Sequence, residues 1–418
     1  MATISRLPNE LLSMIFRLAT MDDESLQQTY DDPFVLSTYR FDEYDRSLDA
    51  FKIKSSISRV CKHWNALSSP FLLEYIFCLH GPRVLSGLEE CLSRGDTGIR
   101  GSRGQWTKRI DLFLNSHADI DLELQKWKQV LSLTPNTTIV DISSEGIDVS
   151  IIPDGWSSVF FALSRLRNLR RVEWHAKNCD LSDLQQLSIL CPNLIHLSFF
   201  LSARDDPDVS TDAFTISFPN IQVFILDWDQ TDYPGTVFPP FQPWNFPQLQ
   251  HFGYFLKGPG PFRIVMPLLE GWGDHLTSLE LPTLGKNELV YFPEELLPSL
   301  PLLETLILDI FKVALPLLPA HRHANLRTLG WRLRLGSALY DTQRLSHCRQ
   351  YFSLEKFPNL ERVRVVHPRD FWDYANNMTA ALISFWNELF VAEGWVPVVD
   401  FDGELVVIPS WEEYGDEE

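Results

Sequence analysis

The stretch Cys191-Pro192-Asn193-Leu194-Ile195-His196-Leu197-Ser198-Phe199 contains the pattern that decides the fold. In the pattern, a leucine-type residue is followed by two variable residues, a second apolar residue, one variable residue and a third apolar residue. The same pattern starts at seven other positions, which are residues 169, 221, 249, 276, 303, 326 and 360. The chain therefore repeats one structural unit.

The spacing of the copies predicts how this unit folds. Neighbouring copies start 23 to 34 residues apart, and most steps fall within the roughly 20–29 residues typical of leucine-rich repeats. We expect each copy to form one short strand whose alternate residues point into a shared core. The residues expected to point inward are Val172, Trp174, Leu197, Phe199, Phe224, Leu226, Phe252, Tyr254, Leu279, Leu281, Leu306, Leu308, Leu329, Trp331, Val363 and Val365.

The predicted fold class is α/β, an irregular leucine-rich-repeat solenoid with a parallel sheet on its concave side. Weaker copies around Ile110-Asp111-Leu112 and Val140-Asp141-Ile142 extend the array upstream. Leucines at every third position between residues 181 and 190 predict a helix on the outer side. An α/β sheet built from unrelated strands and helices is the alternative that stays open.

The C-terminal part departs from the repeat pattern. Residues 379–390 predict a helix, and residues 395–409 predict a short β-rich closing piece. Because a solenoid needs atypical ends to cover its last core layer, we expect repeats over residues 76–378 and a capping segment over residues 379–410. Residues 411–418 form an acidic tail.

Composition excludes several classes of protein. The 418 residues include 36 Lys and Arg against 55 Asp and Glu, a formal net charge of −19, which repels nucleic-acid phosphates and anionic lipid. The N-terminus lacks a signal-peptide pattern, and no apolar run approaches the roughly 18 residues that span a bilayer. Six scattered cysteines without a CxxC pair are typical of reduced thiols. We expect an intracellular protein of the cytoplasm, the nucleus or both, without nucleic-acid or membrane partners.

No motif indicates catalysis. The GxSxG, GxxxxGK, GxGxxG and HExxH patterns are all absent from the sequence. The nearest metal-like clusters, His321 with His323 and His347 with Cys348, match no recognised ligand spacing. We therefore expect a protein that is not an enzyme, with no catalytic residue, no metal and no cofactor.

Two helical segments precede the repeats. The first starts at Leu7-Pro8-Asn9-Glu10, where Pro and Glu favour a helix start, and its apolar residues recur at helical spacing. The second covers residues 53–72. Between them, residues 21–49 contain nine acidic and two basic residues, which predicts an exposed loop with too few apolar residues to pack.

Together the two segments resemble the F-box. The resemblance rests on Leu7-Pro8-Asn9-Glu10-Leu11-Leu12 and Val60-Cys61-Lys62-His63-Trp64, within residues 1–75, with the acidic stretch as an insertion at about 21–49. It implies a three-helix domain that docks on the S-phase kinase-associated adaptor protein of a cullin-RING ubiquitin ligase. The adaptor-binding residues that it implies are Leu7, Pro8, Leu11, Ile15, Val60, Cys61 and Trp64. The alternative is that several of them, above all Ile15 and Trp64, form the core of the helices themselves.

The resemblance and the repeats together imply the substrate-recognition subunit of such a ligase, with a target protein held by the repeats. Candidate partner-binding residues alternate with the core positions and are Arg171, His175, His196, Phe200, His251, Phe255, Arg332, Arg362 and Arg364. The last three favour an acidic or phosphorylated partner segment, unless they pair with nearby acids such as Glu361 and Asp370. The alternative function is a non-catalytic interaction scaffold whose F-box is vestigial or binds only the adaptor.

Overall fold

The computed structural model describes residues 7–20, 26, 34, 52–78, 81–94, 102–115, 120–145, 156–176, 179–202, 215–229, 244–257, 266–281, 290–291, 295–308, 313–315, 321–332, 342–366, 386–387, 390–391 and 394–399. The chain forms two compact units. The first contains residues 1–30 and 43–248, and the second contains residues 31–42 and 249–418. Part of the acidic insertion thus belongs to the second unit, although the sequence on both sides of it belongs to the first.

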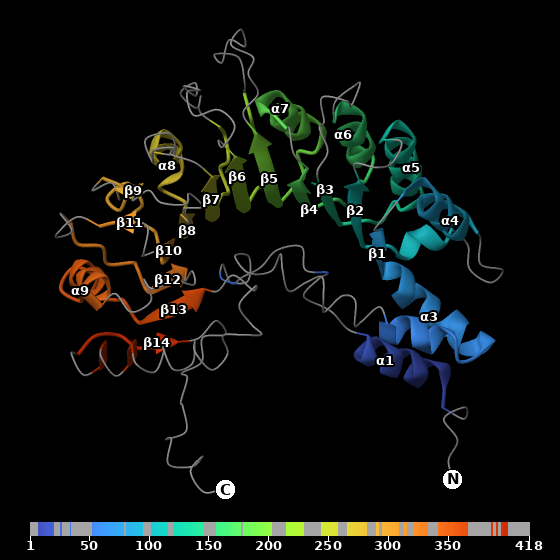
Figure 1. The fold of residues 1–418 in the computed structure, drawn as a ribbon, viewed down its shortest axis with the longest axis horizontal. Helices are drawn as coiled ribbons and strands as arrows, with labels where there is room; N and C mark the ends of the chain where they lie inside the picture. Colours follow the sequence, from blue (N-terminus) through green and yellow to red (C-terminus); the bar gives the residue numbers. More distant parts are fainter. Residues whose placement is uncertain are drawn as a thin grey trace, which may run out of the picture. The chain divides into compact units, whose positions relative to one another are not determined.

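The first unit begins with helices. Helix α1 (Asn9–Ala19) starts after Pro8, whose carbonyl oxygen accepts a hydrogen bond from the amide of Leu12. Residues 52–58 are helical, and α3 (Lys62–Glu74) runs directly into strand β1 (Tyr75–Cys78). The buried face of α1 consists of Leu12 and Phe16. These elements lie at the N-terminal end of the first unit (Figure 1).

The rest of the first unit alternates strands with helical segments. Strand β1 is followed by β2 (Arg109–Asn115), β3 (Ile139–Glu145), β4 (Arg171–His175), β5 (His196–Ser202) and β6 (Val223–Asp229), and all neighbouring pairs are parallel. The segments between them include α4 (Gly81–Ser93), the short 3-10 helix η3 (Arg103–Trp106), α5 (Ile120–Leu133), α6 (Ser157–Ser164) and α7 (Leu181–Leu190). Helices α4 to α7 cover one face of these strands (Figure 1).

The second unit repeats this arrangement with shorter strands. Strands β7 (His251–Lys257), β8 (Ser278–Leu281), β10 (Thr305–Leu308), β12 (Thr328–Arg332), β13 (Arg362–Val366) and β14 (Val398–Val399) pair in that order and in parallel. Strands β9 (Val290–Tyr291) and β11 (Val313–Ala314) form a separate parallel pair. The unit also contains helices α8 (Met266–Trp272) and α9 (Thr342–Tyr351). Each unit is therefore a mixed α/β, solenoid-like stack of parallel strands.

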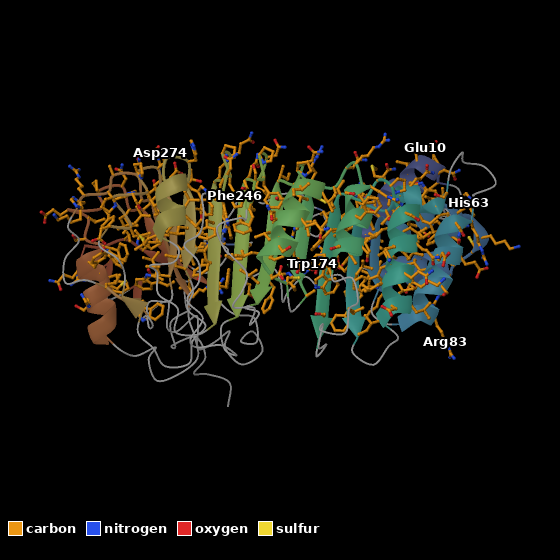
Figure 2. All side chains as sticks on the ribbon, turned by 90° about the horizontal axis from the view of Figure 1, so that it is seen from above. Glu10, His63, Arg83, Trp174, Phe246 and Asp274 are labelled. Carbon is orange, nitrogen blue, oxygen red and sulfur yellow. The ribbon has the colours of Figure 1, made fainter. Side chains whose placement is uncertain are left out.

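The predicted register of the repeat strands is confirmed. All sixteen side chains expected to point inward are at most 4% exposed. Trp174, labelled in Figure 2, lies within this layer, with its ring centroid 4.9 Å from that of Trp156 and 4.7 Å from that of Phe160. The predicted outer helix is also confirmed as α7, where Asp180 and Asp183 cap the first turn reciprocally.

The structure also differs from the sequence-based expectations. The upstream copies are strands β2 and β3 as predicted, but the array starts one strand earlier, at β1. In the predicted closing segment, β14 adds one more parallel strand beside β13. The predicted helix at 379–390 is described only at residues 386–387 and 390–391, which are helical, and the acidic tail at 411–418 lies outside the described residues.

The predicted exposed loop at residues 21–49 is wrong at one position. Phe34, in the middle of this acidic stretch, is buried and packs against Ile307 of β10. A single aromatic side chain without apolar neighbours at a regular spacing leaves no periodic signal, so composition alone indicated a solvated segment. Among the described residues, no helix is both long and apolar enough to cross a membrane.

Candidate functional site

Helix α1 exposes a row of large apolar side chains. Leu7, Leu11, Met14, Ile15 and Leu18 are all exposed, Leu18 by 65%. Leu11, Met14, Ile15 and Leu18 recur at helical spacing and therefore share one side of the helix, and Leu7 precedes its first turn. The opposite side packs on α3, where the ring centroids of Phe16 and Trp64 lie 4.8 Å apart. A helix with one apolar side buried and a second apolar side exposed is typical of a surface that a partner covers.

The residues predicted to bind an adaptor lie on and beside this row. Leu7, Pro8, Leu11, Ile15, Val60 and Cys61 are exposed, and Trp64 is half-buried against Phe16. Cys61 precedes the first turn of α3, where its sulfur accepts a hydrogen bond from the amide of Trp64 at 3.5 Å. Ile15 is thus an exposed residue, whereas Trp64 contributes to the contact between the helices. Their binding to an adaptor stays a prediction.

A cleft of about 920 Å³ adjoins this surface. Met14 and Arg17 of α1, Phe71 and Glu74 of α3, and Lys108 contribute to its walls. Buried Glu74 pairs with Arg17 and with Lys108, whose Nζ lies 2.6 Å from Glu74 Oε1. These ion pairs tie α1 and α3 to the start of β2 and thereby fix the orientation of the exposed row.

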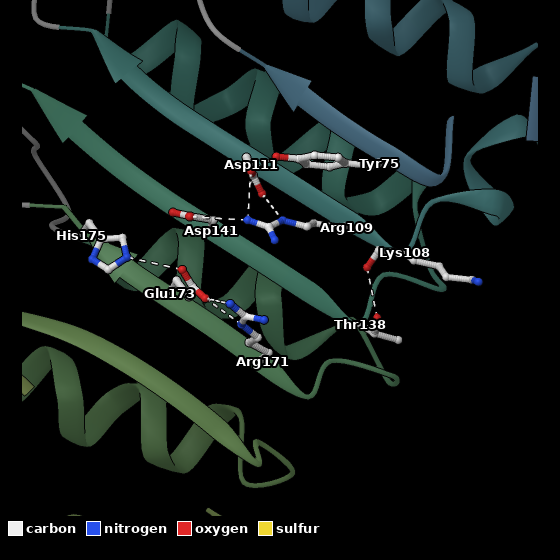
Figure 3. Close-up of polar contacts among 9 residues, drawn as sticks. All are labelled: Tyr75, Lys108, Arg109, Asp111, Thr138, Asp141, Arg171, Glu173 and His175. Atoms are coloured by element: carbon white, nitrogen blue, oxygen red, sulfur yellow. Dashed lines mark hydrogen bonds and ion pairs between the residues drawn. The ribbon is translucent and has the colours of Figure 1, made fainter. Parts of the chain in front are cut away.

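The second face of the first unit's strands, opposite the core, carries buried charges. Arg109 donates to Asp111 with an Nε–Oδ1 distance of 2.7 Å, and its Nη2 lies 3.8 Å from Asp141 Oδ2 on the next strand. The hydroxyl of Tyr75 donates a hydrogen bond to the same Asp111. Figure 3 shows these side chains on the side of β2 and β3 away from the helices. Alternation along the strands places them there.

The next strand, β4, continues the network. Arg171 donates to Glu173 with an Nε–Oε1 distance of 2.6 Å, and His175 Nε2 lies 3.6 Å from Glu173 Oε2 (Figure 3). Burial alone would raise the pKa of Glu173. The charge of Arg171, the neighbouring imidazole of His175 and the charge of Arg109 together hold that pKa well below its usual value. Glu173 is therefore ionised and stabilised by its cationic neighbours.

Three residues of this network have the donor types of a metal site. One ligand atom each of Asp141, Glu173 and His175 lie within 4.8 Å of one another. However, Arg171 donates to Glu173 and Arg109 lies beside Asp141, so two guanidinium groups already neutralise both carboxylates. A divalent cation would have to displace these pairs. The chemistry of the site therefore favours an internal ion-pair network.

The second unit has a corresponding face with its own partners. Buried His251 lies 2.9 Å from the Ser278 hydroxyl through Nδ1. Arg332 donates through Nε to Glu280 at 2.8 Å, and its guanidinium lies 4.9 Å from the ring centroid of Phe255. The guanidinium of Arg364 lies 4.4 Å from the ring centroid of Phe34.

Most of the predicted partner-binding residues are not exposed in either unit. Arg171, His196, Phe200, His251 and Arg364 are buried, His175, Phe255 and Arg332 are half-buried, and Arg362 is exposed. Arg171 is buried by contacts on the second face, such as its hydrogen bond to Glu173. Arg364 is buried because the ring of Phe34 lies against its guanidinium.

The alternative expected Arg332, Arg362 and Arg364 to pair with nearby acids such as Glu361 and Asp370. Arg332 pairs with Glu280, which sequence proximity did not indicate, while Glu361 pairs with Arg327. Asp370 lies outside the described residues. Sequence reasoning missed Glu280 because it lies on β8, and both strand β10 and 52 residues of sequence separate it from Arg332 on β12.

No protein-family model and no curated protein matches the chain. Among solved structures, the chain is similar to the crystal structure of a Bacteroides fragilis protein determined as a structural-genomics target. The two are 14% identical over 65% of this chain and 67% of the other, with a TM-score of 0.29. At this identity and TM-score, the similarity identifies neither a shared fold nor a function.

Proposed function

We propose that the chain is the substrate-recognition subunit of a cullin-RING ubiquitin ligase. In this proposal α1 and α3 bind the adaptor protein, and the repeat units bind a target protein. The observation that carries it is the exposed apolar row formed by Leu11, Met14, Ile15 and Leu18 on α1, with Leu7 just before the helix. The row coincides with one of the two sequence segments that resemble the F-box.

The physical support for an adaptor surface is the division of α1 into two apolar sides. Leu12 and Phe16 are buried, so the exposed row is not needed to attach α1 to α3. Leaving such a row in water is unfavourable by roughly 25 cal/mol for each Å² that a partner would otherwise cover. A permanent partner would remove this cost and explain the row.

The proposed mechanism requires no bond-making group in this chain. A receptor subunit raises the effective concentration of its target near the ubiquitin-loaded enzyme and orients it. The N-terminal helices would supply the attachment to the ligase, and the repeat strands would supply the surface for the target. The chain's lack of catalytic sequence motifs agrees with this role.

The first test is adaptor capture by the full chain. We expect the double variant Leu11→Asp, Ile15→Asp to lose adaptor binding at least tenfold, because two carboxylates would have to be buried in the interface. Leu7→Ala with Pro8→Ala should abolish binding as well. Ile189→Asp is the matched control, because Ile189 is an exposed apolar residue on α7. Unchanged adaptor binding by the folded double variant would contradict the proposal.

The second test separates a ligase receptor from a scaffold. Affinity purification of the full chain should retain the cullin together with the adaptor. Recovery of the adaptor without the cullin would instead support an adaptor-bound scaffold. The same purification with the Leu11→Asp, Ile15→Asp variant should lose both proteins and keep only those bound by the repeats.

Cys61 offers a footprint of the proposed interface. Its side chain is exposed at the start of α3. Maleimide labelling of Cys61 should slow at least tenfold when purified adaptor is added, whereas labelling of half-buried Cys91 on α4 should not change. Equal labelling of Cys61 with and without bound adaptor would place the adaptor elsewhere.

A further inference from the structure

The side chain of Phe34 lies in a contact site that is separate from the proposed adaptor surface, and we call this contact site the seat of Phe34. Phe34 is only 2% exposed although it comes from the acidic insertion. Its ring packs against Ile307 of β10, and the guanidinium of Arg364 of β13 lies 4.4 Å from the ring centroid. An apolar contact and a cation facing the ring are the two features that select an aromatic side chain.

The seat is shaped by a glycine between these two residues. Ile307, Gly330 and Arg364 are direct register partners on β10, β12 and β13, so they form one row across three strands. A Cβ atom at Gly330 would lie 2.6 Å from Ile307 Cγ1 and 2.8 Å from Phe34 Cε1. Because real Cβ atoms do not approach so closely, only glycine leaves room for the ring.

The charges beside the seat match the sequence around Phe34. The aromatic residue follows two acids in Asp31-Asp32-Pro33-Phe34. On β13, exposed Arg362 lies two residues before Arg364 and therefore on the same face of the strand. Cationic side chains next to an aromatic seat favour a segment in which carboxylates precede the ring.

We propose that this seat is a binding site for an aromatic residue in an acidic peptide segment of a partner protein, and that Phe34 occupies it within the chain until such a partner displaces it. The proposal deepens the proposed function and rests on it, since it names the partner chemistry of the repeat part. The insertion then regulates the site: the partner has to compete with Phe34.

Tethering sets the size of the expected effect. A segment linked to its own site has an effective concentration on the order of millimolar. A free peptide of the same sequence with an intrinsic Kd of about 10 µM would therefore bind the intact chain roughly a hundredfold more weakly than a chain with an empty seat. We expect at least a tenfold difference.

The experiment uses a fluorescent peptide of residues 29–38, Thr-Tyr-Asp-Asp-Pro-Phe-Val-Leu-Ser-Thr, and measures its anisotropy with the full chain. Phe34→Ala should bind the peptide at least tenfold more tightly than the wild-type chain does. The matched control is Phe161→Ala, which removes an exposed phenylalanine that also lies beside an arginine, Arg165 at 4.7 Å. This control should bind like wild type.

Two further measurements establish where the peptide binds. Adding Gly330→Val to the Phe34→Ala chain should remove peptide binding, because the valine fills the seat. A peptide with alanine in place of its phenylalanine should not bind, and a peptide with both aspartates changed to asparagine should bind at least fivefold more weakly at low salt. Equal binding by the wild-type and Phe34→Ala chains, or binding that survives Gly330→Val, would overturn the proposal.

Folding and adaptor binding are checked on the same proteins. If Phe34→Ala does not unfold cooperatively, Phe34→Leu keeps an apolar side chain but removes the ring, and it should still bind the peptide more tightly than wild type. Adaptor capture should be equal in the wild-type, Phe34→Ala and Phe34→Leu chains. Absence of peptide binding by the folded Phe34→Ala chain, with intact adaptor capture, contradicts the site alone, whereas absence of adaptor capture by wild type contradicts the proposed function.

Discussion

The rings of Phe16 and Trp64 lie with their centroids 4.8 Å apart and 57° between their planes, and this contact joins α1 to α3. It determines which side of α1 faces solvent. With Phe16 and Leu12 turned towards α3, the neighbouring Leu11 and Ile15 are left exposed. One aromatic contact therefore supports both the local fold and the surface that we propose for adaptor binding.

Replacing Phe16 by alanine should destabilise the α1–α3 contact by about 3–5 kcal/mol, as expected for a buried phenylalanine. Urea unfolding followed by far-ultraviolet circular dichroism, with hydrogen exchange in α1, measures this loss. Leu18→Ala on the exposed side should change stability by less than about 0.5 kcal/mol. Similar effects of the two substitutions would mean that α1 does not pack as described.

Leu306 tests the repeat core. It is fully buried on β10, so Leu306→Ala should cost roughly 2–5 kcal/mol through lost apolar contact and the cavity left behind. Leu302, which is 46% exposed, provides the control, and its alanine variant should lose far less stability. Thermal and urea unfolding of both variants give the comparison. An equal loss in the two would contradict the register of β10.

The Arg171–Glu173 pair should be costly to break from one side. Arg171→Met would leave the carboxylate of Glu173 buried beside fewer cations, for a loss of about 3–5 kcal/mol. Changing Glu173→Leu as well should restore part of the lost stability. The exposed Arg327–Glu361 pair is the control, and Arg327→Met should cost about 0–1 kcal/mol. A double variant less stable than Arg171→Met would contradict this account.

His251 should make the second unit sensitive to mild acid. Burial lowers its pKa from 6.5 to about 3, so below pH 6.5 the unfolded chain binds a proton that the folded chain does not. Stability should therefore fall as pH decreases from 6.5 towards 3, by up to about 1.4 kcal/mol per pH unit. Urea midpoints at pH 7.0 and 5.5 should differ less for His251→Gln than for wild type. Exposed His275→Gln should keep the wild-type difference.

The cysteines should separate into reactive and protected thiols. Cys61 is exposed, whereas Cys179, Cys191 and Cys348 are buried. Burial also raises the pKa of Cys191 to about 12, which leaves almost no thiolate at neutral pH. Mass spectrometry after brief maleimide treatment should find Cys61 modified and these three unmodified, and denaturant should make all of them react. Rapid modification of Cys191 in the native chain would contradict its placement.

Much of the repeat fold was predictable because its signal is local. Successive strand side chains alternate between two faces, so the apolar positions of each copy, such as Leu197 and Phe199, identify the core side directly. The same alternation identified Arg171 and His196 as second-face residues. It did not indicate their burial, because that depends on neighbouring strands and on charges such as Glu173 that neutralise them.

The N-terminal surface was predictable in part. Helical spacing identified the apolar residues of α1 but not which of them would face α3. The contact of Phe16 with Trp64 decides that, because it brings together residues from two helices separated by the insertion. The helical spacing of apolar residues is the same for an exposed row and for a buried row, so it does not predict which one faces solvent.

By itself the sequence determined that this protein repeats a parallel-strand unit and which side chains form its core, because both follow from the period of apolar residues along the chain. Only the tertiary structure decided that Phe34 lies against Ile307 and Arg364, over the space left by Gly330. A contact between one residue and three strands far along the chain has no period. Its energy comes from apolar burial and a cation facing the ring, and both exist only once the strands have aligned in register.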